Sequence, residues 1–329
     1  MKISYGIKHL AETIQKDIVN YVPNLLKNPT EKLALLTATM LIERTANTVD
    51  LAAALPLETQ RLDMRYQWIS RLLASPDLDC VEVMQAFAER IIHTIVDRQH
   101  SVVILIDQTT ASNGHEILMI SLRMGERALP LLWVVKKTEG NIGFEEQKTL
   151  LDHLDVILPE GAKVLLMGDR FYGTCSFVDY CTQLTWSYRL RLKGNINIQI
   201  VSEMISASQL AAREEKFLTN VFLATSGVKT NIGFIHEVGH PEPWIIVMDA
   251  IPDRTTTLDY GKRWSIESLF SDFKTRGFGL EDTQMRLPNR LSRLILVMAL
   301  AIYYAVNAGV WDEENNPTSI EKKRSRSTT

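Results

Sequence analysis

The sequence predicts an α/β protein with a mixed β-sheet at its centre, a helical region before the sheet and a β-rich insertion within it. Residues 101–194 alternate apolar, strand-like runs with segments of helical spacing. A chain with this alternation folds as helices packed on a sheet. Residues 1–96 instead show long helical periodicity and few β-branched runs, with breaks near Pro29 and Pro56. These two textures predict a helical N-terminal region followed by the sheet.

The apolar runs predict the first strands of the sheet in the order in which they follow along the chain. SVVILID (101–107) is apolar throughout and ends in Asp107, which predicts a fully buried central strand. AKVLLMGD (162–169) is a second run of this kind and also ends in an aspartate, Asp169. Between these two runs the spacing predicts strands at 115–125 and 128–137 and a helix at 144–158.

The second half of the chain first leaves this pattern and then returns to it. A helix over 176–184 and a strand over 186–194 are predicted to come next. Residues 195–243 have short β-type segments and weak helical patterning, which indicates an insertion. A strand at 244–250 and a long helix from about Leu258 to Arg276 follow, and we expect Gly277 and Gly279 to stop that helix.

Composition places the chain among soluble globular proteins. Its 329 residues are enough for one large domain or a few smaller ones, and 46% hydrophobic with 23% charged residues is ordinary for such proteins. Cys80, Cys175 and Cys181 are odd in number and form no C-x-x-C, so neither a disulfide framework nor a cysteine zinc site is indicated. The N-terminus has no apolar core of the signal-peptide kind, and we expect a cytoplasmic protein.

One apolar segment has to be distinguished from a membrane span. LILVMALAIYYAV (294–306) contains thirteen uncharged residues, fewer than the roughly 20 that a bilayer requires. A helix that is apolar all round is otherwise a buried helix. We therefore expect this segment to lie in the protein core and expect no membrane partner.

Local positive charge is concentrated in three segments although the net charge is −3. WSYRLRLKG (186–194) and RLPNRLSRL (286–294) carry no acid, and residues 312–329 end in a basic tail that we expect to be disordered. Such runs are usually solvated faces and indicate nucleic-acid binding only where they flank a site. The basic side chains of the first two segments include Arg189, Arg191, Lys193, Arg286 and Arg290.

The pentapeptide HEVGH (236–240) matches H-E-x-x-H, the pattern of zinc peptidases. Its upstream flank TNIGFIHEV alternates with period two, and Pro241 favours extended geometry at His240. In a strand, His236 and His240 would lie about 13 Å apart, too far to share a metal ion. We interpret the match as a coincidence and keep a zinc peptidase only as an unlikely alternative.

The helix that contains YGKRWSIESLFSDFK (260–274) carries a polar stripe beside an apolar face. A surface helix with salt bridges is the ordinary interpretation of such a stripe. Here a single carboxylate lies among groups that bind anions, which favours an anion site around a metal-holding carboxylate. The stripe contains Tyr260, Arg263, Glu267 and Lys274, and the apolar face contains Ile266, Leu269, Phe270 and Phe273.

The spacing Tyr260-x2-Arg263-x3-Glu267-x6-Lys274 resembles the Y-R-E-K signature of DDE transposases in the insertion-sequence family numbered four. The remainder of the chain agrees over roughly residues 100–310. LIDQT contains Asp107, GDRFYG contains Asp169, and an insertion precedes the glutamate. The resemblance implies an RNase H-like core in 97–194 and 244–311 with the β-rich insertion at 195–243. It implies a DNA-end-binding role for residues 1–96 only by position and helical character.

The resemblance also implies a reaction and a metal centre. Asp107, Asp169 and Glu267 would hold two Mg²⁺ or Mn²⁺ ions, because hard oxygen donors without His or Cys suit these ions. Two such ions can activate a water or a 3′-hydroxyl and stabilise the leaving oxygen of a phosphodiester. The expected activity is strand cleavage at insertion-sequence ends and strand transfer into target DNA. The expected partners are the inverted repeats and target DNA, bound by a homodimer that assembles on DNA in the bacterial cytoplasm, in association with the nucleoid.

By the resemblance, Tyr260, Arg263 and Lys274 would hold phosphates, and the other basic residues would line the DNA path.

Three alternatives to this interpretation stay open at this stage. Asp249 also ends an apolar strand and is a rival carboxylate to Glu267. A catalytically inactive, transposase-derived repressor with the same fold is a different class of function, as is the zinc peptidase. Metal-dependent strand cleavage would distinguish the transposase from both.

Overall fold

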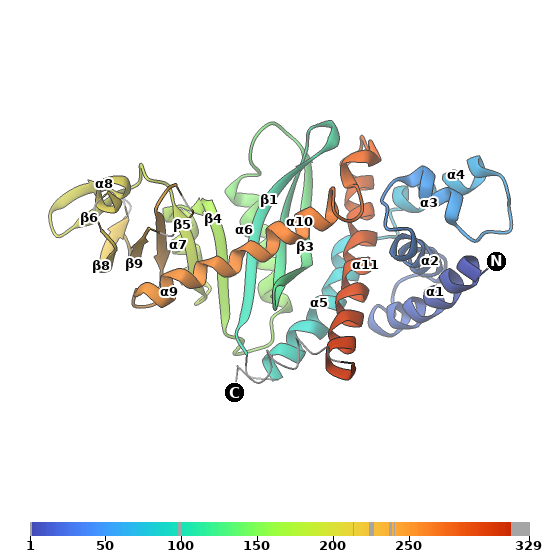
Figure 1. Ribbon diagram of the computed structural model, residues 1–329, viewed down its shortest axis with the longest axis horizontal. Helices are drawn as coiled ribbons and strands as arrows, with labels where there is room; N and C mark the ends of the chain where they lie inside the picture. Colours follow the sequence, from blue (N-terminus) through green and yellow to red (C-terminus); the bar gives the residue numbers. More distant parts are fainter. Residues whose placement is uncertain are drawn as a thin grey trace. The chain divides into compact units, whose positions relative to one another are not determined.

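A ten-stranded β-sheet is the main structural layer of the residues that the computed structural model describes (Figure 1). The structure describes residues 2–97, 100–212, 214–223, 227–236, 239 and 241–316. The chain divides into two units. The helical unit comprises Met1–Met84, Ala111–Asn113 and Ser271–Thr329, and the sheet unit comprises Gln85–Thr110 and Gly114–Phe270.

The predicted helical N-terminal region is confirmed, and its helices begin and end where local chemistry requires. The Asn47 side chain accepts a hydrogen bond from the Val49 N–H at the start of α3, and Arg44 ends α2 in a left-handed conformation with φ of 53°. Leu33, Leu36 and Met40 of α2 are fully buried in the core of the helical unit. The N-terminal helices are α1 (Lys2–Tyr21), α2 (Lys27–Glu43), α3 (Thr48–Ala54), α4 (Leu62–Ala74) and α5 (Cys80–Asp97).

Helix α11 (Pro288–Asn315) contains the apolar segment that was predicted to be a core helix. Proline at its first turn suits a helix start, because the missing N–H would have no partner there. By length and composition α11 is the only helix among the described residues that could cross a membrane, yet 56% of its apolar window is buried in the protein. Residues 294–303 are all buried. Their apolar character is therefore explained by packing.

The sheet has parallel pairing at its centre and antiparallel pairing in the insertion. Strand β1 pairs in parallel with β4, and β4 with β5, whereas β5 pairs antiparallel with β10. The order across the sheet is β3-β2-β1-β4-β5-β10-β9-β8-β6-β7. The first strands are β1 (Val102–Ala111), β2 (His115–Met124), β3 (Arg127–Lys137), β4 (Val164–Gly173) and β5 (Ser187–Leu192). This mixed sheet with its helices confirms the predicted α/β, RNase H-like fold class.

The remaining elements of the sheet unit connect and extend these strands. Helices α6 (Phe144–Ile157) and α7 (Cys175–Gln183) lie close to their predicted positions. The described part of residues 195–243 forms short strands and a short helix that continue the sheet beyond β10 (Trp244–Met248). These elements are β6 (Asn197–Ile200), β7 (Glu203–Ser206), α8 (Ala207–Ala211), β8 (Lys216–Leu223) and β9 (Val228–Ile235).

The HEVGH segment begins immediately after β9, which ends at Ile235. Nε2 of His236 lies 2.7 Å from the carbonyl oxygen of Ala211, at the end of α8. Glu237 and His240 lie outside the described residues. His236 thus has a structural partner within the insertion, which agrees with interpreting the zinc motif as a coincidence.

The long helix predicted from about Leu258 to Arg276 is a composite path (Figure 1). It starts earlier than predicted, at α9 (Arg254–Leu258), because Asp253 and Thr256 form a capping box. It continues as a 3₁₀ segment (Asp259–Trp264) and then as α10 (Ser265–Phe273). It ends earlier because the Phe278 N–H turns back to the Asp272 carbonyl oxygen at 2.9 Å. Gly277 fits against that carbonyl, where any Cβ would overlap it.

Candidate active site

The first two candidate carboxylates stand side by side because their strands are parallel neighbours. The ladder between β1 and β4 pairs Val102 with Val164 and ends where Ile106 pairs with Gly168. Asp107 and Asp169 are the next residue on each strand. The two aspartates therefore meet at one edge of the parallel ladder.

Both strands continue past their aspartates, which the sequence did not predict. Strand β1 extends to Ala111 and β4 to Gly173. The apolar runs stop at the aspartates because residues that follow them line a polar cavity. Strand β1 can nevertheless continue, because β2 is its neighbour on the other side. The aspartates thus lie within the strands, at the point where the ladder between β1 and β4 opens.

The motif GDRFYG forms a large bulge that turns its side chains out of the sheet. Gly168 pairs with Leu190 and Gly173 with Leu192, so the four residues from Asp169 to Tyr172 oppose Arg191 alone. Bulges of this kind redirect side chains and are common beside active sites. The two glycines have separate roles. Tyr172 packs directly on Gly168, and a Cβ at Gly173 would overlap the Arg191 carbonyl.

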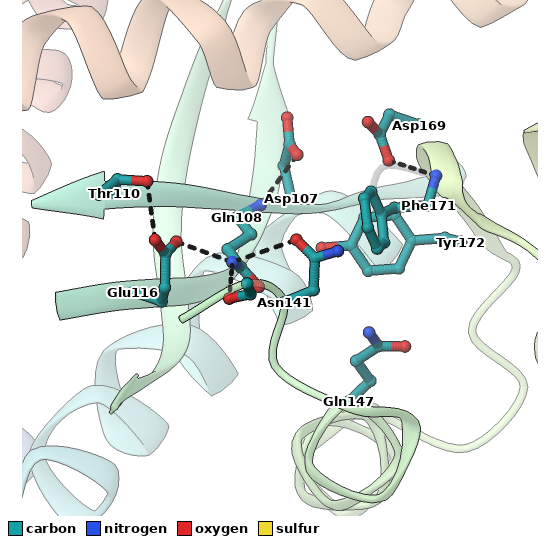
Figure 2. Close-up of a pocket in the computed structure, with 10 residues that line it drawn as sticks. Asp107, Gln108, Thr110, Glu116, Asn141, Gln147, Asp169, Phe171 and Tyr172 are labelled. Atoms are coloured by element: carbon teal, nitrogen blue, oxygen red, sulfur yellow. Dashed lines mark hydrogen bonds between the residues drawn. The ribbon is translucent and has the colours of Figure 1, made fainter. Parts of the chain in front are cut away.

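A cavity of about 340 Å³ lies beside the two aspartates (Figure 2). Backbone N–H groups orient both carboxylates at 2.8 Å: that of Gln108 donates to Asp107, and that of Phe171 donates to Asp169. The cavity is lined by Asp107, Gln108, Thr110, Glu116, Gly140, Asn141, Gln147, Asp169, Phe171 and Tyr172.

A polar network in this cavity includes residues that the sequence analysis missed. The Gln108 side-chain amide donates to Glu116 at 2.7 Å, and its oxygen accepts the Ile142 N–H at 2.8 Å. Thr110 also donates to Glu116, at 2.8 Å. The available signal was weak: polar residues directly after Asp107, and a glutamate early in an otherwise apolar strand. Nothing in the sequence pairs these positions with the loop at Asn141.

Arg263 brings the third carboxylate to the site. Its Nη1 lies 2.8 Å from Oδ2 of Asp107, and its Nη2 forms a short ion pair with Glu267, four residues further on. The residue is 8% exposed, and its Nε is buried without a hydrogen-bond partner among the described residues. Asp107 and Glu267, from the sheet and from the helical path, are therefore joined through one guanidinium.

The charges at the site oppose one another. The pKa of Asp107 is raised to about 6. Burial is the main cause, the neighbouring Asp169 and Glu267 also raise the pKa, and Arg263 opposes them. Burial by itself would lower the pKa of Arg263, but Tyr260, Asp107 and Glu267 more than compensate and raise it. Three carboxylates within electrostatic range of one another favour a cation between them.

The donor chemistry fits a divalent metal ion of the magnesium type. Asp107, Asp169 and Glu267 offer hard oxygen donors, which Mg²⁺ and Mn²⁺ prefer. Three carboxylates also carry more negative charge than the single guanidinium of Arg263 can neutralise. Within the described residues, no group of three or more His, Cys, Asp or Glu side chains is close enough to hold a metal ion. Binding would therefore require these carboxylates to move closer together.

Tyr260 lies in the core with its hydroxyl near the site. Its residue is 1% exposed, and its ring contacts Trp244 edge-on with centroids 5.4 Å apart. Burial raises the pKa of Tyr260 to about 12, and Arg263, Asp169, Arg191 and Asp107 also influence it. The expectation that Tyr260 lies on an open polar stripe is wrong. The 3₁₀ segment and the aromatic packing turn its ring into the core instead.

Lys274 lies in the turn after α10, because the helix ends at Phe273. Its Nζ lies 3.5 Å from Glu281. The predicted continuous stripe therefore ends before Lys274, and this lysine has its own acidic partner. The neighbouring apolar face is as predicted, since Ile266, Leu269, Phe270 and Phe273 are all buried.

Arg189 and Asp249 form a structural pair away from the candidate site. Nη1 of Arg189 lies 3.0 Å from Oδ1 of Asp249, and Arg189 is 6% exposed. Strand β10 is antiparallel to β5, so its last residues lie beside Ser187 at the start of β5. The aspartates of β1 and β4 lie at the opposite ends of the parallel strands. Asp249 is thus no rival to Glu267, and Arg189 is too buried to contact DNA.

The other basic residues remain accessible to different degrees. Arg191 is partly buried and lies 3.5 Å from Glu242, whereas Lys193 is exposed and lies over the Phe171 ring. In the helical unit, Arg286 is exposed and Arg290 donates to Ser70 at 3.3 Å.

Comparison with known proteins agrees with this geometry. A family model described as a transposase DDE domain matches residues 102–304. This span begins at the strand of Asp107 and includes Asp169 and Glu267. No curated protein matches the chain.

Replacing Gly173 with Ala should destabilise the sheet unit by about 1–3 kcal/mol, because the new Cβ overlaps the Arg191 carbonyl. Urea unfolding would measure the change. Gly261→Ala is the matched control, since its Cβ would meet Trp244 at an ordinary 3.8 Å. Equal stability of the two variants would show that the bulge tolerates a side chain at Gly173.

Asp107→Asn should stabilise the metal-free protein near pH 7.5 by about 1–3 kcal/mol, because ionising the buried Asp107 opposes folding. The folded-state pKa of about 6 is above the ordinary 3.8. The folded wild type therefore loses stability as pH rises from about 4 through 6, and the variant does not. Chemical unfolding in chelator across this range is the measurement. A variant that is less stable than wild type at pH 7.5 would show that the Arg263 pair outweighs the burial of Asp107.

Proposed function

The chain belongs to the transposase DDE domain family, and on that premise we propose that it cleaves DNA strands at insertion-sequence ends and transfers them into target DNA. We assign it to the branch with the Y-R-E-K signature. The observation that carries the proposal is the placement of Asp107 and Asp169 on neighbouring parallel strands, with Glu267 linked to Asp107 through Arg263. Asp107, Asp169 and Glu267 are the proposed catalytic residues.

These carboxylates would hold Mg²⁺ or Mn²⁺, in a two-ion site. When bound, such ions activate the attacking water or 3′-hydroxyl and stabilise the leaving oxygen. The protein itself contributes the orientation. Backbone N–H groups fix the Asp107 and Asp169 carboxylates, and the bulge directs Asp169 out of the ladder. Asp107 is partly buried, with 16% of its side chain exposed.

Tyr260 and Arg263 are withdrawn from the direct phosphate contacts because they are 1% and 8% exposed. Arg263 is instead proposed to position Asp107 and Glu267, which it binds through its guanidinium. The Tyr260 hydroxyl lies within electrostatic range of Arg263 and Asp107. Two aromatic rings, Tyr260 and Trp264, lie within about 6 Å of the guanidinium carbon and support its orientation.

DNA contacts are proposed on Arg191, Lys193, Lys274, Arg286 and Arg290. Arg189 is withdrawn from this set because it is buried against Asp249. In this proposal residues 1–96 bind the inverted repeats, 97–194 and 244–311 form the catalytic core around the 195–243 insertion, and two chains assemble on DNA. The proposed location is the bacterial cytoplasm, at the nucleoid.

Replacing Asp107, Asp169 or Glu267 with Ala should reduce magnesium-dependent strand cleavage below detection and leave DNA binding largely intact, because each change removes a proposed metal ligand. The assay uses labelled duplexes that carry candidate inverted repeats. Asp249→Asn is the control: it alters the structural pair with Arg189 and should still cleave. Wild-type cleavage rates in all three variants would refute the assignment. A folded wild-type protein that binds these ends without cleaving would favour the repressor.

Lys274→Ala should weaken binding to specific and unrelated DNA alike and lower the salt slope by about one unit, because phosphate contacts carry little sequence information. Glu281→Ala is the complementary variant. It frees Lys274 from its 3.5 Å partner and should tighten binding. Affinity measured against salt concentration tests both. An unchanged slope in a folded Lys274→Ala variant would remove this lysine from the interface.

A further inference from the structure

An aromatic ring lies partly exposed beside the catalytic carboxylates. Phe171 is 40% exposed, lines the same cavity as Asp107 and Asp169, and follows Asp169 by two positions in the bulge. Its backbone N–H holds the Asp169 carboxylate at 2.8 Å. The position of Phe171 is thus tied to the site, while its ring remains available to solvent (Figure 2).

Packing of the core does not account for this ring. The next residue, Tyr172, is 2% exposed and contacts Phe177 edge-on with centroids 5.5 Å apart. Tyr172 also fits onto Gly168. The bulge therefore directs one aromatic residue into the core and the other toward the cavity. A single exposed aromatic is common on protein surfaces, so further evidence must come from its surroundings.

The surroundings of Phe171 are those of a stacking site for an electron-rich ring. Nζ of Lys193 lies 4.6 Å from the Phe171 ring centroid. Lys193 lines a second cavity of about 520 Å³, together with Arg170, Arg191 and Glu242. Glu242 lies 3.2 Å from Arg170 and 3.5 Å from Arg191, so three cationic side chains there face one carboxylate. Phe171 therefore stands between the carboxylate cavity and a basic one. Aromatic rings in positively charged grooves are the elements that bind single-stranded nucleic acid.

Polar groups in the cavity wall near Phe171 can form hydrogen bonds with the edge of a nucleobase. Figure 2 shows the Asn141 carboxamide pointing toward the Phe171 ring. Nε2 of Gln108 lies 3.4 Å from the Asn141 oxygen and 3.3 Å from the Gly140 carbonyl oxygen, and so positions this loop. A carboxamide can both donate to and accept from a base edge. The cavity volume of about 340 Å³ is within the range of ligand pockets.

We propose that Phe171 is a stacking platform for an unpaired nucleobase of the DNA strand that enters the carboxylate site. Lys193 supports the far side of the platform, and the Asn141 carboxamide contacts the base edge. This inference rests on the proposed function only in taking DNA as the ligand. It assigns to Phe171 a role in positioning the strand.

The test compares two DNA probes of the same arbitrary sequence, a blunt duplex and a duplex with a single-stranded overhang. A fluorescent purine analogue replaces each overhang base in turn, and chelator prevents any cut during the measurement. Phe171→Leu should weaken binding of the overhang probe about 5- to 100-fold, since stacking of a base on an aromatic ring has that effect. It should also abolish the fluorescence change of one overhang base and leave blunt-duplex binding unchanged.

Two further variants make the result specific. Phe217→Leu alters a comparably exposed ring, at 37%, on β8 of the same unit and should bind like wild type. Phe171→Trp retains a stacking ring and should keep the overhang affinity. A thermal melt confirms that each variant is folded.

Three outcomes would overturn the platform: no fluorescence change with wild type, unchanged overhang binding in Phe171→Leu, or equal weakening for both probes. Strand cleavage with magnesium is measured separately in the same preparations. Loss of the fluorescence change in Phe171→Leu with no cleavage by wild type would support the platform and refute the proposed enzyme. If wild type cleaves DNA but the binding assay does not depend on Phe171, the result would support the proposed enzyme and refute the platform.

Discussion

The ion pair between Arg263 and Asp107 is the interaction on which the geometry of the candidate site depends. It connects residues 156 positions apart and joins the helical path to the centre of the sheet. The same guanidinium binds Glu267, so two of the three family carboxylates are held by one side chain. Burying a charge is costly unless it is paired, and each partner here makes the burial of the other tolerable. The pairing with Arg263 compensates only part of the cost of ionising Asp107, because burial, and then Asp169 and Glu267, still raise the pKa of Asp107. Excess negative charge in a partly buried cavity favours the binding of a cation. The same charge opposes the stability of the folded protein when no cation is bound.

The bulge in β4 is the second constraint. Four residues of β4 oppose one residue of β5, and the chain can make this excursion because glycine occupies both of its ends. Neighbouring side chains of the bulge therefore point to different parts of the structure. Asp169 turns to the carboxylate site, Tyr172 turns to the core, and Phe171 remains at the cavity. One local irregularity in the sheet therefore determines both the proposed metal site and the proposed stacking platform.

Strand direction separates the proposed catalytic aspartates from a structural one. Asp107, Asp169 and Asp249 each follow an apolar run, and in sequence they look alike. Because β10 is antiparallel to β5, Asp249 lies at the start of β5 and is engaged by Ser187, Tyr188 and Arg189. The membership of the chain in the transposase DDE domain family agrees with this assignment of roles, since the matched span begins at the strand of Asp107. The same pairing removes Arg189 from the candidate DNA contacts.

The sequence by itself determined the fold class, most element positions and the three candidate carboxylates, but not the polar residues that line the cavity beside them. Period and apolar run length reported burial directly, which is why β1, β4, α6 and the buried face of α10 were predictable. The spacing of Tyr260, Arg263 and Glu267, with the two aspartates, predicted a DDE transposase because it is a local pattern, and the family match supports that class. The tertiary structure alone decided which charges meet. The partner of Arg263, the burial of Arg189 and the network of Gln108 with Glu116 depend on contacts between distant segments. Periodicity carries no information about such contacts, because it reports which face of an element is buried and not what covers that face.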